Sequence, residues 1–333
     1  MRLLLLSLAM ILSGFAQAEQ VNIYSFRQPF LIEPILAEFS KETGIKTKVI
    51  FAKKGLIQRL KREGELSPAD LVLTSDFNKL LQLKEQGLTQ EFELSGSLKK
   101  HIPDQFRDSK NHWLALTKRV RNVYSSKAKA GDQSNIRYED LADEKFKGKI
   151  CTRSGKHPYN LGLVASMIAH HGETETEVWL KGVKANLARK PQGNDRAQVK
   201  AIKEGLCDIS LGNSYYLGKM LQDPKQVAWA NAVNLNFPNQ QDRGAHINVS
   251  GAVIAKHAPH KAAAQKLLEF LAADQAQNLY AELNMEYPVS LSAKPSALVQ
   301  SWGEFKADAL PLEKIAFYRK HALKLIDKVH FDL

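Results

Sequence analysis

"WLALTKRVRNVYSS", residues 113–126, is a long extended segment in the middle of the chain. Arg119 and Arg121 are two positions apart, so they lie on the same face of a strand. A second long extended segment, "AHINVSGAVIAK", occupies residues 245–256. Each segment separates regions in which short strands alternate with helices. Two long strands that cross between two such regions predict two lobes joined by an extended hinge.

The region before residue 113 alternates strand and helix. Short apolar strands are predicted at 21–25, 47–52 and 69–75, with amphipathic helices between them. This alternation is typical of a parallel sheet covered by helices on both faces. A second alternating region contains "KICT" (149–152) and "CDISLG" (207–212).

The predicted fold class is therefore α/β, a two-lobed clamshell with a mixed sheet flanked by helices in each lobe. We expect residues 19–117 plus 247–295 to form the first lobe. Residues 118–246 plus 296–333 are expected to form the second. Ligands of open α/β sheets bind beyond the carboxyl ends of the strands, so the cleft between the lobes is the expected site.

Residues 1–18 have the pattern of a secretory signal peptide. Arg2 is followed by an apolar run, Leu3 to Phe15, and by the small-residue motif Ala16-Gln17-Ala18. The sequence has no second apolar run of membrane length, so we expect a periplasmic protein with no membrane span, and a monomer. Removal of Arg2 lowers the formal net charge from +12 to +11. Export argues against nucleic acid as the partner of this basic chain.

Signatures of enzymes are absent from the sequence. It has no G-x-S-x-G, P-loop, G-x-G-x-x-G or H-E-x-x-H motif. Adjacent histidines on a helix do not converge, and "MIAHHGE" (167–173) is typical of a helix that ends at Gly172 with His170 and His171 near its negative pole. We expect a protein that is not an enzyme.

Cys151 and Cys207 are the only two cysteines. An even number in an oxidising compartment predicts one disulfide, and each cysteine lies at the edge of an apolar segment. The alternative is a pair of buried free thiols. Two thiolates are too few for a structural zinc site.

"LGNSYYLG", residues 211–218, places Tyr215 and Tyr216 side by side. Adjacent side chains converge only at a special place, such as the first turn of a helix beside a cleft. The simpler interpretation is one core ring and one surface ring. If the two cysteines are bonded, Tyr159 lies at the same sheet edge, and three phenols form a site suited to Fe³⁺ rather than to Ca²⁺, Mg²⁺, Zn²⁺ or Cu.

Three phenolates leave an octahedral shell half filled, so a small anion or water is expected to complete it. "RSGKHPYN" (153–160) follows the strand that contains Cys151 and leads into a helix. Ser154 and Gly155 suit a turn that exposes backbone N–H groups, and Arg153 adds positive charge. Together with Asn213, these residues form the predicted anion cradle.

Several segments, among them "GNSYYLG", "CTRSGKHPYN" and "FPNQQDRGAHINVSGAVIAKHAP", resemble the periplasmic ferric-iron-binding proteins of bacterial ABC transporters. The similarity covers essentially the whole mature chain. It implies a type II periplasmic binding fold, similar to transferrin, that captures Fe³⁺ and delivers it to an inner-membrane ABC permease with its ATPase.

The resemblance also implies the site residues. The family's metal ligands correspond to Tyr159, Tyr215 and Tyr216. Its synergistic-anion pocket, for an anion such as carbonate or citrate, corresponds to Ser154, Gly155, Asn213 and Arg153.

The sequence departs from the family at the N-terminal lobe. Many relatives read "YSSRHY" after the first strand, where His and Tyr close the site, whereas "YSFRQPF" here places Gln28 and Pro29 at those positions. Neither is a good ferric ligand. Arg27 and Arg119 are expected to balance the anion across the cleft, or else to form salt bridges in the hinge.

Two other functions are compatible with parts of this sequence. A binding protein for an organic or inorganic anion would use Arg27, Arg119 and Arg153 for recognition, with the tyrosines only stacking. A secreted metal-dependent hydrolase would use histidines, and the candidates are His170, His171 and His246.

Overall fold

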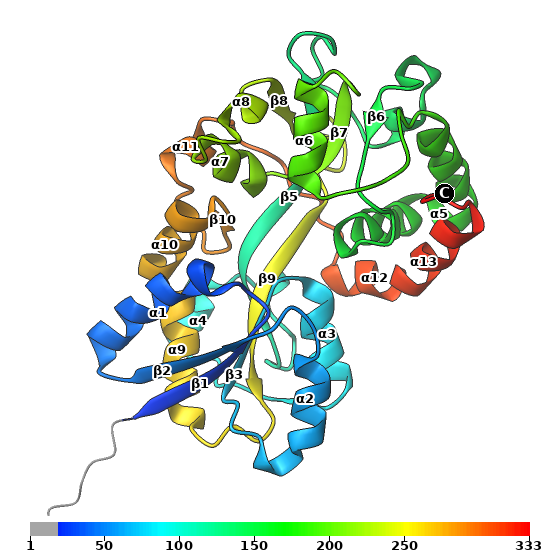
Figure 1. Cartoon of the computed structure of the whole chain (residues 1–333). Coiled ribbons are helices and arrows are strands. Elements are labelled where there is room, and N and C mark those ends of the chain that lie inside the picture. Colours follow the sequence, from blue (N-terminus) through cyan, green and yellow to red (C-terminus); the bar gives the residue numbers. More distant parts are fainter. Residues whose placement is uncertain (1–18) are drawn as a thin grey trace, which may run out of the picture.

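The computed structural model describes residues 19–333, so the predicted signal peptide at 1–18 lies outside the described residues. Figure 1 shows two α/β lobes, one above the other, with β5 (Leu114–Ser126) and β9 (Ile247–Ala255) running between them. The two-lobed fold expected from the sequence is confirmed. Both long strands begin and end within two residues of the predicted extended segments.

The first lobe is built on a three-stranded parallel core. β1 (Gln20–Ser25) pairs in parallel with β2 (Lys46–Phe51) on one side and with β3 (Leu71–Thr74) on the other. Every residue of β3 is buried, as expected of a strand covered on both faces. The helices of this part of the chain are α1 (Pro29–Thr43), α2 (Leu56–Glu63), α3 (Phe77–Glu85) and α4 (Gly96–His101).

β5 belongs to both lobes. Its first half, Leu114 to Val120, pairs antiparallel with β9, and its second half, from Arg121 onward, pairs antiparallel with β7 (Ile209–Asn213) and β8 (Val233–Asn236). Gly251 of β9 lies so close to β5 that an added Cβ would be 2.2 Å from the Leu114 carbonyl oxygen. The crossing of the two strands therefore depends on a residue without a side chain.

The second lobe continues the sheet beyond β5. The strand order is β2-β1-β3-β9-β5-β7-β6, and β6 (Ile150–Cys151) runs parallel to β7. The helices of this part are α5 (Pro158–Ala185), α6 (Asp195–Lys203), α7 (Tyr215–Leu221) and α8 (Val227–Ala230). Near the carboxyl terminus, α12 (Leu312–Phe317) and α13 (Arg319–Lys328) pack along α5 (Figure 1).

The predicted disulfide between Cys151 and Cys207 is confirmed. It joins β6 to the residues just before β7, and the two strands are parallel neighbours in which Cys151 is paired with Ser210. The chain therefore leaves both strands at the same edge of the sheet. Tyr159 follows the first of these strands and Tyr215 follows the second.

The structure corrects the helices at two places. The segment "HKAAAQKLLEFLAADQAQNLYAELN" (260–284) has the pattern of one long helix. It forms two, α9 (Lys261–Ala272) and α10 (Asp274–Asn284), because Ala273 is extended and the Asp274 carboxylate accepts hydrogen bonds from Ser290 and Ser292. The helix expected to end at Gly172 does break there, where φ is 80°, but a second helical segment follows directly and reaches Ala185. The remaining short elements are β4 (Thr89–Gln90), β10 (Tyr287–Pro288) and α11 (Ala297–Gln300).

Candidate metal centre in the interlobe cleft

The three tyrosines singled out in the sequence line one cavity of about 400 Å³. Residues from both lobes contribute to its wall. Those that bear on the argument are Arg27, Gln28, Lys53, Arg119, Arg153, His157, Tyr159, Tyr215, Tyr216 and Glu286. The cavity is therefore the interlobe site expected from the fold, and it brings together phenols, cations and one carboxylate.

Tyr215 and Tyr216 are the first two residues of α7, and only Ser214 separates this helix from the end of β7. Their ring centroids lie 4.1 Å apart. The end of β7 is held by Tyr124, whose hydroxyl donates to the Asn213 carbonyl at 2.8 Å. Gly212 allows the Tyr124 ring to lie against this strand, since an added Cβ would be 2.3 Å from it. The first turn of a helix thus directs two adjacent side chains to one point.

Tyr159 is the second residue of α5. Pro158 occupies the first helical position, as proline often does, and His157 precedes it, with its Nδ1 accepting a hydrogen bond from the Tyr159 N–H at 3.3 Å. The guanidinium groups of Arg119, Arg121 and Arg153 lie 5.8, 5.9 and 5.4 Å from the centroid of the Tyr159 ring. Three guanidinium groups therefore lie close to one phenol ring.

Burial keeps the neighbouring phenols protonated while no metal is bound. It raises the pKa of Tyr215 well above its ordinary value, and Tyr159 and Tyr216 raise it further. Burial followed by the charges of Tyr159 and Asp195 raises the pKa of Tyr216 to about 12. Only a strong Lewis acid displaces such protons near neutral pH, because ligand deprotonation is coupled to metal binding.

Three arginines give the cavity a positive wall. Arg27 forms a buried salt bridge with Glu286 at 2.9 Å, Arg153 contacts Asp195 at 3.2 Å, and Arg119 donates to the Ser75 carbonyl. In each of these arginines the Nε atom is buried and has no hydrogen-bond partner among residues 19–333. Burial opposes ionisation of Glu286, but Arg27 and Arg119 outweigh it and lower its pKa. One carboxylate against several cations leaves a surplus of positive charge.

Three of the predicted anion contacts are not in the wall of this cavity. The Asp332 carboxylate accepts hydrogen bonds from the Ser154 hydroxyl at 2.5 Å and from the Gly155 N–H at 2.7 Å. The Asn213 N–H donates to the Asp195 carboxylate, and the side-chain oxygen of Asn213 accepts a hydrogen bond from Arg121. Ser154, Gly155 and Asn213 are thus engaged within the second lobe. The expected cradle at Ser154 and Gly155 does bind an anion, which is the protein's own carboxylate.

The structure adds residues that the sequence reasoning missed. His157 lines the cavity with its ring centroid 4.6 Å from that of Tyr159. Burial and then the charge of Arg153 lower its pKa to about 3, so the ring is neutral. The position of His157 directly before Pro158, at the start of a helix, could have identified it from the sequence as a residue beside Tyr159. No local sequence pattern identifies Glu286, because its partner Arg27 is 259 residues away.

The first lobe contributes cations, amides and the carboxylate of Glu286, which is paired with Arg27. Gln28 lines the cavity and directly precedes α1, in which Pro29 is the first residue. Within the described range 19–333, the first-lobe residues that line the cavity include no Tyr, His or Cys. A second cavity of about 530 Å³ shares Lys53, His157 and Tyr159 with the first, and it is also lined by Lys54 and Lys79. The cleft is therefore wider than the tyrosine cluster and stays basic.

The histidines considered for a hydrolase lie elsewhere. His170 contacts Asp308 at 2.7 Å and His171 contacts Glu139 at 2.8 Å. His246 is buried, and its backbone N–H donates to the Tyr138 hydroxyl at 3.1 Å. Within the part of the chain that the structure describes, no group of three or more His, Cys, Asp or Glu side chains is placed to hold a metal.

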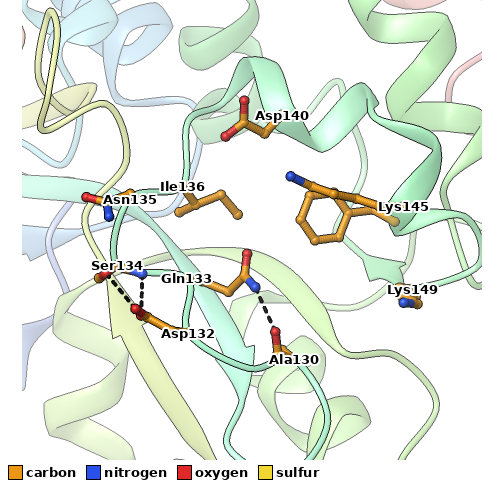
Figure 2. A pocket seen from close by; sticks show the side chains of 10 residues that line it. Ala130, Asp132, Gln133, Ser134, Asn135, Ile136, Asp140, Lys145 and Lys149 are labelled. Atoms are coloured by element: carbon orange, nitrogen blue, oxygen red, sulfur yellow. Dashed lines mark hydrogen bonds between the residues drawn. The ribbon is translucent and has the colours of Figure 1, made fainter.

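A separate surface pocket of about 380 Å³ is formed by residues 130–149 of the second lobe (Figure 2). Its polar groups bond to one another. The Asp132 carboxylate accepts from both the N–H and the hydroxyl of Ser134, and the Gln133 amide donates to the Ala130 carbonyl. The pocket shares no lining residue with the tyrosine cavity and contributes nothing to the candidate site.

Over residues 19–333 no helix combines the length and the apolar character needed to cross a membrane. Residues 66–306 match the family described as bacterial extracellular solute-binding protein, a description of binding proteins rather than enzymes. Iron uptake protein A1 of Synechocystis sp. is 40% identical over 315 residues, covering 94% of this chain and 87% of the relative.

Solved structures agree with this match. Mannheimia haemolytica ferric iron-binding protein A in an open conformation is 55% identical with a TM-score of 0.90, covering 95% of this chain and 100% of its own. A Trichodesmium protein in complex with iron and citrate ligands is 39% identical with a TM-score of 0.89, covering 94% of this chain and 99% of its own. Sequence, fold and cleft together lead to one conclusion: the chain belongs to the bacterial extracellular solute-binding protein family and has the type II periplasmic binding fold of the ferric-binding proteins.

Proposed function

We propose that this protein captures Fe³⁺ in its interlobe cleft through the phenolate oxygens of Tyr159, Tyr215 and Tyr216. The observation that carries the proposal is the convergence of these three tyrosines on one cavity with a positively charged wall. Phenolate oxygen is a hard, negatively charged donor that suits a small, highly charged cation. The names of the Synechocystis and Mannheimia relatives, one an iron uptake protein and the other a ferric iron-binding protein, support the same cargo.

An exogenous anion completes the site. Three phenolates balance the charge of Fe³⁺ but fill half of an octahedral shell, while Arg27, Arg119, Arg153 and Lys53 leave surplus positive charge in the wall. An anion that binds iron on one side and these cations on the other satisfies both requirements. Carbonate or citrate has this chemistry, and the Trichodesmium structure, with its iron and citrate ligands, supports an anion of this class.

The loaded protein delivers iron to an inner-membrane ABC permease with its ATPase. We place it in the periplasm as a monomer, with lobes bounded near residues 117 and 246. The family match to extracellular solute-binding proteins supports this assignment.

The test is a visible absorption spectrum recorded while purified mature protein is titrated with ferric citrate. Phenolate-to-Fe³⁺ charge transfer gives a coloured complex with wild type. Tyr215→Phe/Tyr216→Phe is expected to abolish the band and Tyr159→Phe to weaken it strongly. Tyr318→Phe is the matched control, because Tyr318 lies outside the cavity, and its band should be unchanged.

A colourless wild-type protein would overturn the proposal. The alternative, a binding protein for a small anion, would then be tested by calorimetry with iron-free citrate. Its affinity should depend on Arg153 and be insensitive to the Tyr→Phe changes.

A further inference from the structure

The last residues of the chain contact the loop that leads to Tyr159. This loop, residues 152–157, joins β6 to α5. Asp332, the second residue from the carboxyl end, accepts hydrogen bonds from the Ser154 hydroxyl at 2.5 Å and the Gly155 N–H at 2.7 Å. Figure 1 shows the carboxyl terminus beside α5. Two hydrogen bonds to one side chain therefore join the terminal segment to this loop.

Other contacts fix the terminal segment in place. Phe331 is buried against Gly155, where an added Cβ would be 2.8 Å from its ring. The Lys184 ammonium group donates to the Val329 carbonyl at 3.1 Å, and Lys156 forms a salt bridge with Asp327 at 2.5 Å. The position of Asp332 is thus determined by packing as well as by its own hydrogen bonds.

A short path of hydrogen bonds leads from Asp332 to the metal centre. The Ser154 carbonyl accepts from the His157 N–H at 3.1 Å, and His157 Nδ1 accepts from the Tyr159 N–H at 3.3 Å. The Asn160 amide donates to the carbonyls of Arg153 and Ser154 at 3.0 and 3.2 Å. The loop is therefore held from the helix on one side and from the carboxyl terminus on the other.

We propose that Asp332 is a positioning residue for the metal centre: by holding Ser154 and Gly155 it fixes the loop that orients His157 and Tyr159 toward Tyr215 and Tyr216. The inference rests on the proposed function, because it assumes that Tyr159 is a ligand. Groups that hydrogen-bond directly to a metal ligand typically change metal affinity 10- to 100-fold when they are mutated. Asp332 acts on Tyr159 through Ser154 and His157, so we expect an effect at the lower end of this range. A carboxylate fits this position because both of its partners are donors.

The experiment measures ferric iron affinity by competition with a chelator, in variants of the full mature chain. Asp332→Asn keeps the shape but replaces one acceptor with a donor that faces Ser154 or Gly155, and roughly 10-fold or greater weakening is expected. Asp143→Asn is the matched control, because the Asp143 carboxylate forms an exposed salt bridge with Lys145, away from this loop and the terminal segment. It should bind iron like wild type, and melting temperatures show that both variants fold.

A double-mutant cycle separates positioning from general stability. In a Tyr159→Phe background Asp332→Asn should have little further effect on iron affinity, whereas in a Tyr216→Phe background it should keep its full effect. Equal effects in both backgrounds, or wild-type affinity in a folded Asp332→Asn variant, would overturn the inference. A wild-type protein that does not bind iron would instead overturn the proposed function.

Discussion

Tyr215 and Tyr216 retain their protons in the metal-free protein because burial raises both pKa values, that of Tyr216 to about 12. Below that pH the phenol must lose a proton before its oxygen can bind a cation. Iron affinity is therefore expected to rise with pH throughout the neutral range. Each displaced proton contributes roughly a tenfold change in apparent affinity per pH unit.

We expect iron loading to release at least two protons, one each from Tyr215 and Tyr216. A pH-stat measurement at neutral pH, corrected for protons taken up by the iron donor, gives the number directly. Tyr216→Phe should release one proton fewer than wild type, and Tyr318→Phe the same number. Iron binding without proton release would mean that the phenols are not ligands.

At the scale of elements, β5 and β9 approach each other closely where they cross. Leu114 to Val120 pairs with β9, and the Thr117 and Ser250 hydroxyls meet at 2.6 Å across the two strands. Both faces of this region are buried. The hinge is therefore a packed sheet and not a flexible linker.

Gly251→Ala is expected to destabilise the protein by about 2 kcal/mol or more, because its Cβ would meet the Leu114 carbonyl oxygen at 2.2 Å. Urea denaturation gives the free energy of unfolding. Gly96→Ala is the matched control, since nothing lies within 4 Å of its Cβ position. Stability should be unchanged or slightly raised in that variant, and equal stability of the two variants would contradict the role of the close approach.

Elements with a strong local pattern were predictable from the sequence. The strands of the first lobe, the two long crossings and the helix start at Pro29 follow from alternation, apolar runs and proline geometry. The break between α9 and α10 at Ala273 was not predictable, because it is stabilised by Ser290 and Ser292 from a later segment.

In the candidate site too, features with a local sequence pattern were predictable, and contacts between distant residues were not. The three tyrosines were found from their spacing after two cysteines. The partner of Ser154 and Gly155 was not found, because Asp332 follows 178 residues after Ser154 and no local signal joins them. Contacts between residues far apart in the chain are decided by packing, which a single sequence does not display.

At the scale of the whole molecule, the two lobes present different chemistry to the cargo. The second lobe offers three phenols, whereas the first lobe offers cations, amides and one carboxylate, Glu286, which is already paired with Arg27. A ligand shifts a conformational equilibrium only through contacts that differ between the two states. Iron bound by the second lobe alone makes few contacts that form only in the closed state, so it stabilises closure weakly.

We therefore expect nearly superimposable X-ray scattering profiles for the iron-free and iron-loaded protein. Gln28→His/Pro29→Tyr gives the first lobe two side chains that can bind a metal. This variant should become more compact on iron loading. Strong compaction of the wild type would show that the first lobe already contributes to closure.

The contact between Asp332 and the loop at Ser154 also couples two segments that lie 178 residues apart in the chain. On our proposal, a substitution at Asp332 changes how tightly the tyrosine cluster holds iron, although it leaves every tyrosine and every strand in place. A search for variants of altered iron affinity should therefore cover the segment that follows α13 as well as the cleft.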